Sequence, residues 1–220
     1  MFKERIPETN NGITGELLVK DYDLMQKTFR DRGTLATEDI FYFGINTGNV
    51  LEIGPGPGYL GLEWLKKSNN GFLYWLEISE DMKNIAIKNA KEYGLEDRVK
   101  CLISDATKGF PFKNDFFDAV ITSGSFHEWQ KPIETINEIN RVLKKEGKFF
   151  IEDLKRDINP FIKFLMKSFT KQKAMKNGLI SSINAAYLKS EINIIFNNSK
   201  LENFNVKESP FGLTITGEKK

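Results

Sequence analysis

The sequence predicts an α/β fold with a doubly wound sheet of seven strands, mostly parallel and ending in an antiparallel hairpin. Short apolar runs alternate with helix-like patterns over residues 49–154. The run at 72–77 is apolar up to its last residue, as expected for a parallel strand that is covered on both faces. The runs at 203–209 and 212–217 are separated by two residues, which is too short for a parallel crossover, so this pair must be antiparallel.

Each helix and strand is predicted from the spacing of its apolar residues and from residues that favour the start or the end of a helix. Ser79 can cap a helix that ends at Gly94, and Pro132 suits the start of a helix that runs up to Gly147. Residues 1–16 are polar and predict a loose arm. The other expected helices are at 17–31, 34–45, 59–67, 161–169 and 185–197, and the expected strands are at 49–53, 72–77, 98–103, 116–122, 148–154, 203–209 and 212–217.

Composition limits the function classes. With 220 residues, 40% hydrophobic and 28% charged, the chain suits a single folded domain. No signal peptide and no apolar run long enough to cross a membrane are evident, so we expect a cytoplasmic protein without a membrane partner. The net charge of +2 argues against a general nucleic-acid binder. Cys101 is the only cysteine and there is one histidine, so we expect no internal disulfide and no metal site.

The stretch at 50–58, Val-Leu-Glu-Ile-Gly-Pro-Gly-Pro-Gly, is the most informative. A strand runs through glycines into a helix, at the strand end where open α/β sheets bind ligands. Glycines let the backbone approach a ligand closely, and the helix N-terminus offers N–H groups to an anion. Gly56, Gly58 and Gly61 also match the dinucleotide pattern, with Glu77 about 20 residues further on, so the loop alone leaves NAD, or a plain tight turn, open.

Five ordered motifs within 48–154 resemble those of class I S-adenosylmethionine (SAM) dependent methyltransferases. The stretch 138–147 departs from the family pattern at Lys145 and Glu146, where Pro and Gly are usual. A NAD enzyme would explain only the first two motifs. The motifs are Glu52-Ile-Gly-Pro-Gly-Pro-Gly58, Glu77-Ile-Ser-Glu-Asp-Met82, Asp105-Ala106 followed by Pro111-Phe112, Phe117-Asp-Ala-Val120, and Glu138-Ile-Asn-Arg-Val-Leu-Lys-Lys-Glu-Gly147.

The resemblance implies a Rossmann-like fold, SAM as cofactor and transfer of its methyl group. It divides the chain into an N-terminal helical arm that covers the pocket, residues 1–45, and a SAM-binding domain, residues 46–220, within one domain overall. It implies that Gly54, Gly56 and Gly58 pack against the methionine part of SAM. Glu52 would hold the loop and the methionyl ammonium, or only brace the loop.

The same resemblance implies roles along the rest of the cofactor. Glu77 would accept hydrogen bonds from both ribose hydroxyls, because a carboxylate offers two acceptor oxygens. Asp105 would accept from the adenine amino group beside the Ala106 N–H, or would merely cap a turn before Thr107. The remaining expected pocket residues are Ile78 and Met82 against adenine or in the core, Ser123 near the sulfonium, and Tyr22 closing the pocket.

His127 is the candidate catalytic residue. It is the single histidine and follows the fourth expected strand, where its pKa could make it a general base for an acceptor O–H or N–H. The alternative is that it packs or hydrogen-bonds beside SAM. Methyl transfer from a sulfonium can proceed by positioning alone.

The motifs do not identify the methyl acceptor, and a small molecule is the preferred hypothesis. The stretch Ser123-Gly-Ser-Phe126 lacks the prolines usual in DNA amino-methyltransferases. The basic segment 155–176 leaves an anionic substrate or RNA possible, although a solvated lysine-rich face explains it too. Its aromatic residues would form a pocket wall or core. Two other functions stay open: a non-catalytic SAM-binding domain and a NAD-dependent oxidoreductase.

Overall fold

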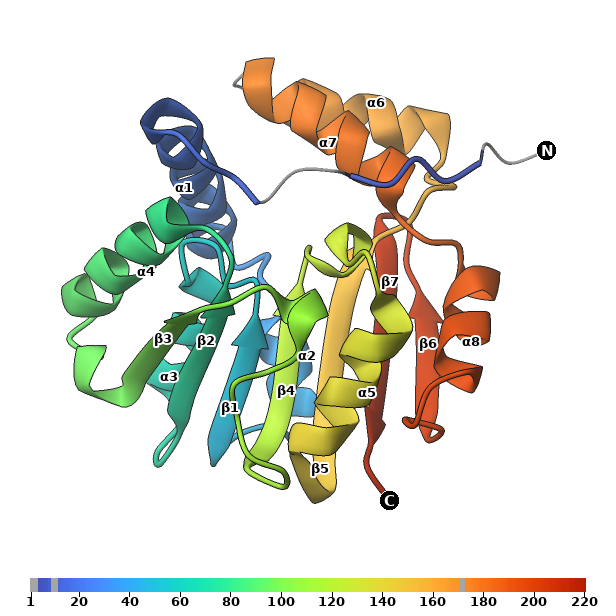
Figure 1. Ribbon diagram of the computed structural model, residues 1–220. Coiled ribbons are helices and arrows are strands. Elements are labelled where there is room, and N and C mark those ends of the chain that lie inside the picture. The colour runs from blue at the N-terminus through green and yellow to red at the C-terminus, as the bar shows by residue number, and fades with distance from the viewer. Residues whose placement is uncertain (1–3, 9–11, 171–172) are drawn as a thin grey trace.

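A computed structural model describes residues 4–8, 12–170 and 173–220. Their strands form one seven-stranded sheet in the order β3-β2-β1-β4-β5-β7-β6 (Figure 1). Neighbouring strands from β3 to β5 are parallel, and β7 runs antiparallel to both β5 and β6, which confirms the predicted fold class. The strands are β1 (Asn49–Ile53), β2 (Phe72–Glu77), β3 (Val99–Ile103), β4 (Phe117–Ser123), β5 (Leu143–Leu154), β6 (Phe204–Glu208) and β7 (Gly212–Glu218).

Helices cover both faces of this sheet. In Figure 1, α5 and α8 lie in front of the sheet, α2 and α3 lie behind it, and α6 and α7 lie above the carboxyl ends of the parallel strands. The helices are α1 (Glu16–Asp31), α2 (Thr37–Tyr42), α3 (Tyr59–Lys67), α4 (Glu80–Glu92), α5 (Pro132–Val142), α6 (Pro160–Phe169), α7 (Lys173–Ala185) and α8 (Lys189–Asn197).

The core consists of two apolar layers, one on each face of the sheet. Successive strand residues point to opposite faces, so Leu51 joins the layer under α5 and α8, whereas its neighbour Val50 joins the layer under α2, α3 and α4. Both side chains are fully buried. This is the reason that the parallel strands read as continuous apolar runs.

A buried carboxyl group fastens β1 to β2 and α3 below the glycine loop. The indole Nε1 of Trp75 donates to Oε2 of Glu52 at 2.6 Å, and the backbone N–H of Gly61 also donates to this carboxyl. Gly61 is required there, because a Cβ on it would collide with Glu52 Oε2. Burial raises the pKa of Glu52 to about 8.

The structure departs from the sequence expectations in several helices. Of the helix expected at 34–45, only Thr37–Tyr42 is helical. The expected helix at 185–197 is wrong in its first turn: α7 ends at Ala185 and α8 begins at Lys189, where Glu191 Oε2 accepts from the N–H of Leu188 at 2.8 Å. Helix α5 ends at Val142 rather than near Gly147, because β5 pairs with β4 from residue 143 onward. Helix α7 was not expected.

The N-terminal segment is a second departure. The expectation of a loose arm over 1–16 is wrong for residues 4–8, while 1–3 and 9–11 lie outside the described residues. Arg5 Nε donates to the carbonyl of Ala185 at 2.6 Å, and its guanidinium lies over the ring of Tyr187 at 4.1 Å. The N–H of Ile6 donates to the carbonyl of Asn184 at 3.1 Å. The segment is thereby docked against the end of α7.

Among the described helices, none has the length and apolar character that a membrane span requires. The cytoplasmic location stays a prediction.

Replacement of Glu52 by Gln should flatten the pH dependence of stability. The folded-state pKa of Glu52 is raised from its ordinary value of 4.5 to about 8, so the folded chain holds this proton more tightly than the unfolded chain. Stability from this group is therefore lost as pH rises from about 4.5 to about 8. Thermal unfolding of the wild type and Glu52→Gln, followed from pH 5 to pH 9, should show the steeper loss in the wild type. The control Glu16→Gln replaces an exposed acid and should leave the wild-type pH dependence unchanged. Equal slopes of stability against pH in the wild type and in Glu52→Gln would contradict the raised pKa of Glu52.

Candidate active site

A pocket lies where the chain connections from β1 and β4 diverge to opposite faces of the sheet. Such a switch point is where open α/β sheets bind ligands. Gly12 and Ile13, which precede α1, and Tyr22 on α1 line one side of the pocket. Its lining residues are Gly12, Ile13, Tyr22, Ile53, Gly54, Gly56, Leu76, Glu77, Ile78, Met82, Ser104, Asp105, Ala106, Thr107, Gly124, Ser125, Glu128, Trp129 and Gln130.

Two of the three predicted loop glycines line this pocket. Gly54 and Gly56 both have left-handed backbone angles, with φ of +63° and +54°. A Cβ on Gly54 would lie 2.8 Å from the Cβ of Ser125, so a side chain there would intrude between loop and pocket wall. Gly58 does not line the pocket: a Cβ on it would lie 2.7 Å from the ring of Trp75, so this glycine serves the packing of α3 on β2.

The carboxylate of Glu77 is held at the end of β2 by backbone N–H groups. Oε2 accepts from Gly56 at 3.1 Å, and Oε1 accepts from Ile78 and Ser79, both at 2.9 Å. Only 5% of the residue is exposed, yet it lines the pocket. Burial raises the pKa of Glu77, although these N–H groups oppose the rise.

Asp105 caps a turn and also faces the pocket. Its Oδ1 caps the following turn, accepting from the N–H of Thr107 at 2.9 Å and from its hydroxyl at 2.7 Å, and the residue also lines the pocket. Burial raises the pKa of Asp105, but the bonds from Thr107 and Lys108 outweigh it and leave the pKa below its ordinary value. Ala106 lines the pocket beside it, as do the predicted Ile78 and Met82.

Besides Gly58, two more of the predicted cofactor residues lie outside the pocket lining. Glu52 is occupied with Trp75 beneath the loop, in the bracing role. Ser123 is exposed and its hydroxyl donates to Glu152 at 2.9 Å. The pocket residue is instead Ser125, whose hydroxyl lies 2.6 Å from that of Thr122. A sequence can place the end of β4 only to within a residue or two, which is the size of this error.

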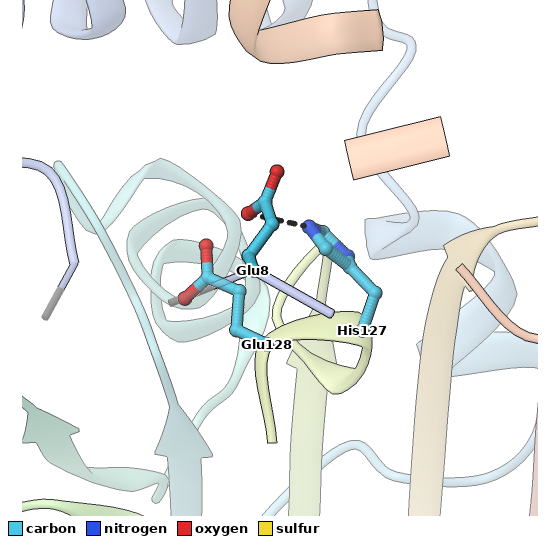
Figure 2. A group of neighbouring side chains, drawn as sticks. All are labelled: Glu8, His127 and Glu128. Carbon is cyan, nitrogen blue, oxygen red and sulfur yellow. Dashed lines mark ion pairs between the residues drawn. The ribbon is translucent and has the colours of Figure 1, made fainter. Parts of the chain in front are cut away.

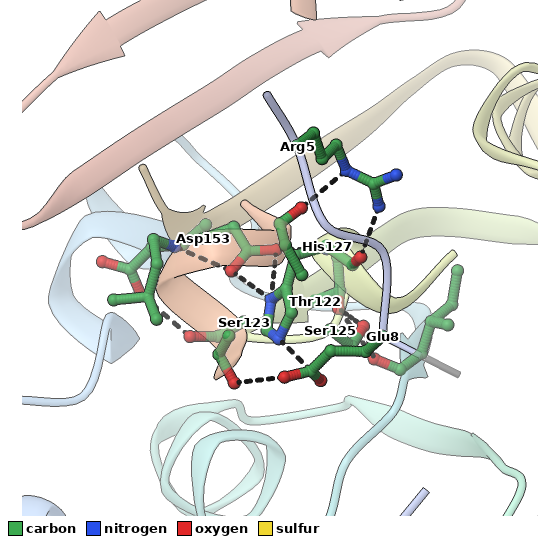
Figure 3. Close-up of polar contacts among 12 residues, drawn as sticks. Arg5, Glu8, Thr122, Ser123, Ser125, His127 and Asp153 are labelled. Atoms are coloured by element: carbon green, nitrogen blue, oxygen red, sulfur yellow. Dashed lines mark hydrogen bonds and ion pairs between the residues drawn. The ribbon is translucent and has the colours of Figure 1, made fainter. Parts of the chain in front are cut away.

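His127 lies behind the pocket wall rather than in the lining. It is buried, and its Nδ1 lies 2.7 Å from Oδ1 of Asp153, while its backbone N–H donates to Asp153 Oδ2 at 2.6 Å (Figure 3). Its Nε2 points toward the carboxylate of Glu8, 3.7 Å from Oε2 (Figure 2). That distance is too long for a hydrogen bond, and Nε2 has no hydrogen-bond partner among the described residues.

The surroundings of His127 are acidic. Burial lowers the pKa of its imidazole, but Asp153, Glu128 and Glu8 outweigh this and raise the pKa to about 9. Burial raises the pKa of Glu128 to about 7, against the opposing effect of His127. Glu8, His127 and Glu128 each offer a ligand atom within 4.8 Å of the others, an arrangement that could hold a metal ion (Figure 2). Apolar spacing and local motifs do not reveal this grouping, because Glu8 is more than a hundred residues from His127 in the chain.

The basic segment 155–176 is partly neutralised by acids from outside it. Lys155 pairs with Glu208 and Arg156 with Glu191, both at 2.6 Å. Its aromatic residues line no pocket wall and no core, because they are 65–71% exposed: Phe161, Phe164 and Phe169.

The single histidine permits a direct check on this acidic cluster. We expect the ring protons of His127 to titrate near pH 9 in proton NMR spectra, because Asp153 stabilises the imidazolium. In Asp153→Asn the titration midpoint of His127 should fall by more than one pH unit, because the negative charge that opposes the effect of burial is then absent. A wild-type midpoint near the ordinary 6.5 would refute the ion pair.

The chain is similar in sequence to known methyltransferases. Residues 51–151 match the family model described as a methyltransferase domain. An uncharacterized methyltransferase of Bacillus subtilis, YdaC, is 31% identical over 77% of this chain and 87% of its own length. A demethylmenaquinone methyltransferase of Leptospira interrogans is also 31% identical, but over 53% of this chain and 47% of its own length.

A solved structure agrees in fold. A Methanococcus maripaludis protein assigned to the S-adenosyl-L-methionine-dependent methyltransferases superposes with a TM-score of 0.74 at 24% identity, covering 95% of this chain and 98% of its own. Sequence and fold therefore agree, and the chain belongs to the class I SAM-dependent methyltransferases.

Proposed function

We propose that this enzyme binds SAM in the pocket at the switch point and transfers its methyl group to a small-molecule acceptor. The observation that carries the proposal is the buried Glu77 carboxylate at the rim of the glycine loop. A carboxylate has about four acceptor positions, and three are used by the backbone N–H groups, so Oε2 retains capacity for a ribose hydroxyl.

The other lining residues fit the remaining parts of SAM. Asp105 Oδ2 lies 3.4 Å from Nζ of Lys108 and has a second lone pair for the adenine amino group, with the Ala106 N–H beside it. Ile78 and Met82 supply apolar surface for the ring. The left-handed loop at Gly54 leaves room for the methionyl part. We assign Glu52, Gly58 and Ser123 supporting roles outside direct cofactor contact.

The chemistry that SAM supplies when bound is an electrophilic methyl group, which leaves sulfur as the acceptor atom forms its new bond and gives up a proton. The protein's part is alignment and exclusion of water. The part of the pocket left for the acceptor is formed by Tyr22 on α1 and by the lining residues after β4, which are Gly124, Ser125, Glu128, Trp129 and Gln130.

We do not assign His127 the role of a direct base. It lies outside the pocket lining, and a pKa of about 9 leaves the imidazole protonated at neutral pH. A protonated imidazole has no lone pair with which to take a proton. Proton removal from the acceptor then falls to solvent or to a group in the pocket.

A small acceptor is favoured by the cover of the pocket. Gly12, Ile13 and Tyr22 lie over it, in support of a pocket-covering role for residues 1–45, although Ile40 of α2 belongs to the core instead. The net charge of +2 and the ion pairs in the basic segment argue against RNA. The Leptospira relative is named for demethylmenaquinone, a small molecule.

Calorimetric titration with SAM, S-adenosylhomocysteine and NAD tests the proposal. We expect micromolar binding of SAM and S-adenosylhomocysteine and none of NAD. Loss of hydrogen bonds to a charged acceptor costs about 1.5–3 kcal/mol each, so Glu77→Ala should weaken binding roughly tenfold or more.

Glu80→Ala is the matched control, because Glu80 is an exposed acid at the start of α4 and should leave affinity unchanged. Thermal unfolding of each variant separates loss of the site from loss of the fold. Binding of NAD alone, or unchanged SAM affinity in a folded Glu77→Ala, would overturn the proposal.

A further inference from the structure

The side chains of Glu8, His127 and Glu128 converge from two distant parts of the chain. Glu8 comes from the docked N-terminal segment, and the other two come from the short turn after β4. Their ligand atoms lie within 4.8 Å of one another (Figure 2). Two ligands at about 2.1 Å from a tetrahedral ion lie about 3.4 Å apart. The 3.7 Å between His127 Nε2 and Glu8 Oε2 is close to that spacing.

His127 is oriented as metal-bound histidines usually are. Its Nδ1 bonds the carboxylate of Asp153, which fixes the ring and directs Nε2 away from it (Figure 3). A carboxylate behind the imidazole is the common second contact of a metal-bound histidine. Only 3% of His127 is exposed, and its Nε2 has no hydrogen-bond partner among the described residues. A buried polar atom without a hydrogen bond lowers the stability of the fold, and a bound ion at this atom would remove that penalty.

The charge around this nitrogen is unbalanced. Glu8, Glu128 and Asp153 place three carboxylates about one imidazole. The nearby Arg5 guanidinium is directed at backbone carbonyls, those of Ala185 and of residue 127. A divalent cation would offset carboxylate charge that the imidazole alone does not balance.

We propose that Glu8, His127 and Glu128 bind one divalent transition-metal ion. The imidazole of His127 gives up its Nε2 proton to solvent as this nitrogen binds the ion, because a metal-bound histidine is neutral. One imidazole nitrogen with two carboxylates suits Zn²⁺, Mn²⁺ or Co²⁺ better than Mg²⁺ or Ca²⁺, which prefer all-oxygen sites. Three protein ligands leave a position for water or for an oxygen of the acceptor. Glu128 also lines the cofactor pocket, so the ion would sit in the pocket wall.

The site also gives the N-terminal segment a function. Glu8 reaches the cluster because Arg5 and Ile6 anchor the segment to the end of α7. An ion would therefore tie this segment to the turn after β4. Metal binding should stabilise the docked segment in the absence of SAM.

The proposal can be tested without measuring activity. The metal-free protein is titrated with ZnCl₂ at pH 7.5, and binding is monitored by NMR of the single histidine and by calorimetry. We expect one equivalent of Zn²⁺ to shift the His127 ring signals and to bind with micromolar affinity or better. Co²⁺ should give visible absorption that Zn²⁺ displaces. Asp153→Asn should weaken binding 10–100-fold, the usual cost of losing such a supporting carboxylate.

Glu8→Gln is the key variant, because the hydrogen bonds of Arg5 and Ile6 that dock the segment do not involve Glu8, so its replacement should spare the fold. It should weaken Zn²⁺ binding at least tenfold. The control Glu4→Gln changes an exposed acid on the same segment and should not alter binding. No saturable binding by the wild type, or equal affinity in wild type and Glu8→Gln, would overturn the proposal.

Discussion

The buried carboxylate of Glu77 is the constraint on which the site depends. It accepts N–H groups from Gly56 in the loop after β1 and from Ile78 and Ser79 after β2, so it joins two adjacent strand ends. The glycine loop takes its left-handed course over this acceptor. Below the loop, Glu52 and Trp75 join the same two strands. Two buried acids, one facing the pocket and one facing the core, thus set the geometry of the cofactor site.

Most of the fold could be predicted from the sequence because parallel strands covered on both faces leave a strong local pattern. Strands β1 and β2 and helix α3 begin and end at the expected residues. The errors occur where the pattern is not local. The end of α5 is set by pairing of Leu143 with Phe117, and the docking of residues 4–8 depends on carbonyls at the end of α7. Neither partner can be recognised from apolar periodicity.

Only part of the site could be predicted, again because the sequence reveals local patterns and not contacts between distant segments. Gly54, Gly56, Glu77 and Asp105 belong to ordered motifs, and the structure brings them together around one pocket. Features that depend on three-dimensional proximity were missed, since Ser125 replaces Ser123 in the lining, and the contacts of His127 with Asp153 and Glu8 join three separate segments. The expectation of no metal site rested on the single cysteine and the single histidine, whereas the proposed site also draws on two carboxylates.

We propose that Glu77 and Asp105 hold the two ends of the adenosine of SAM. A crystal structure of the protein with S-adenosylhomocysteine tests it most directly. The account predicts a ribose hydroxyl within hydrogen-bond distance of Glu77, and the adenine amino group against Asp105. Density for the ligand at another place on the sheet edge, or a ribose that does not contact Glu77, would contradict it.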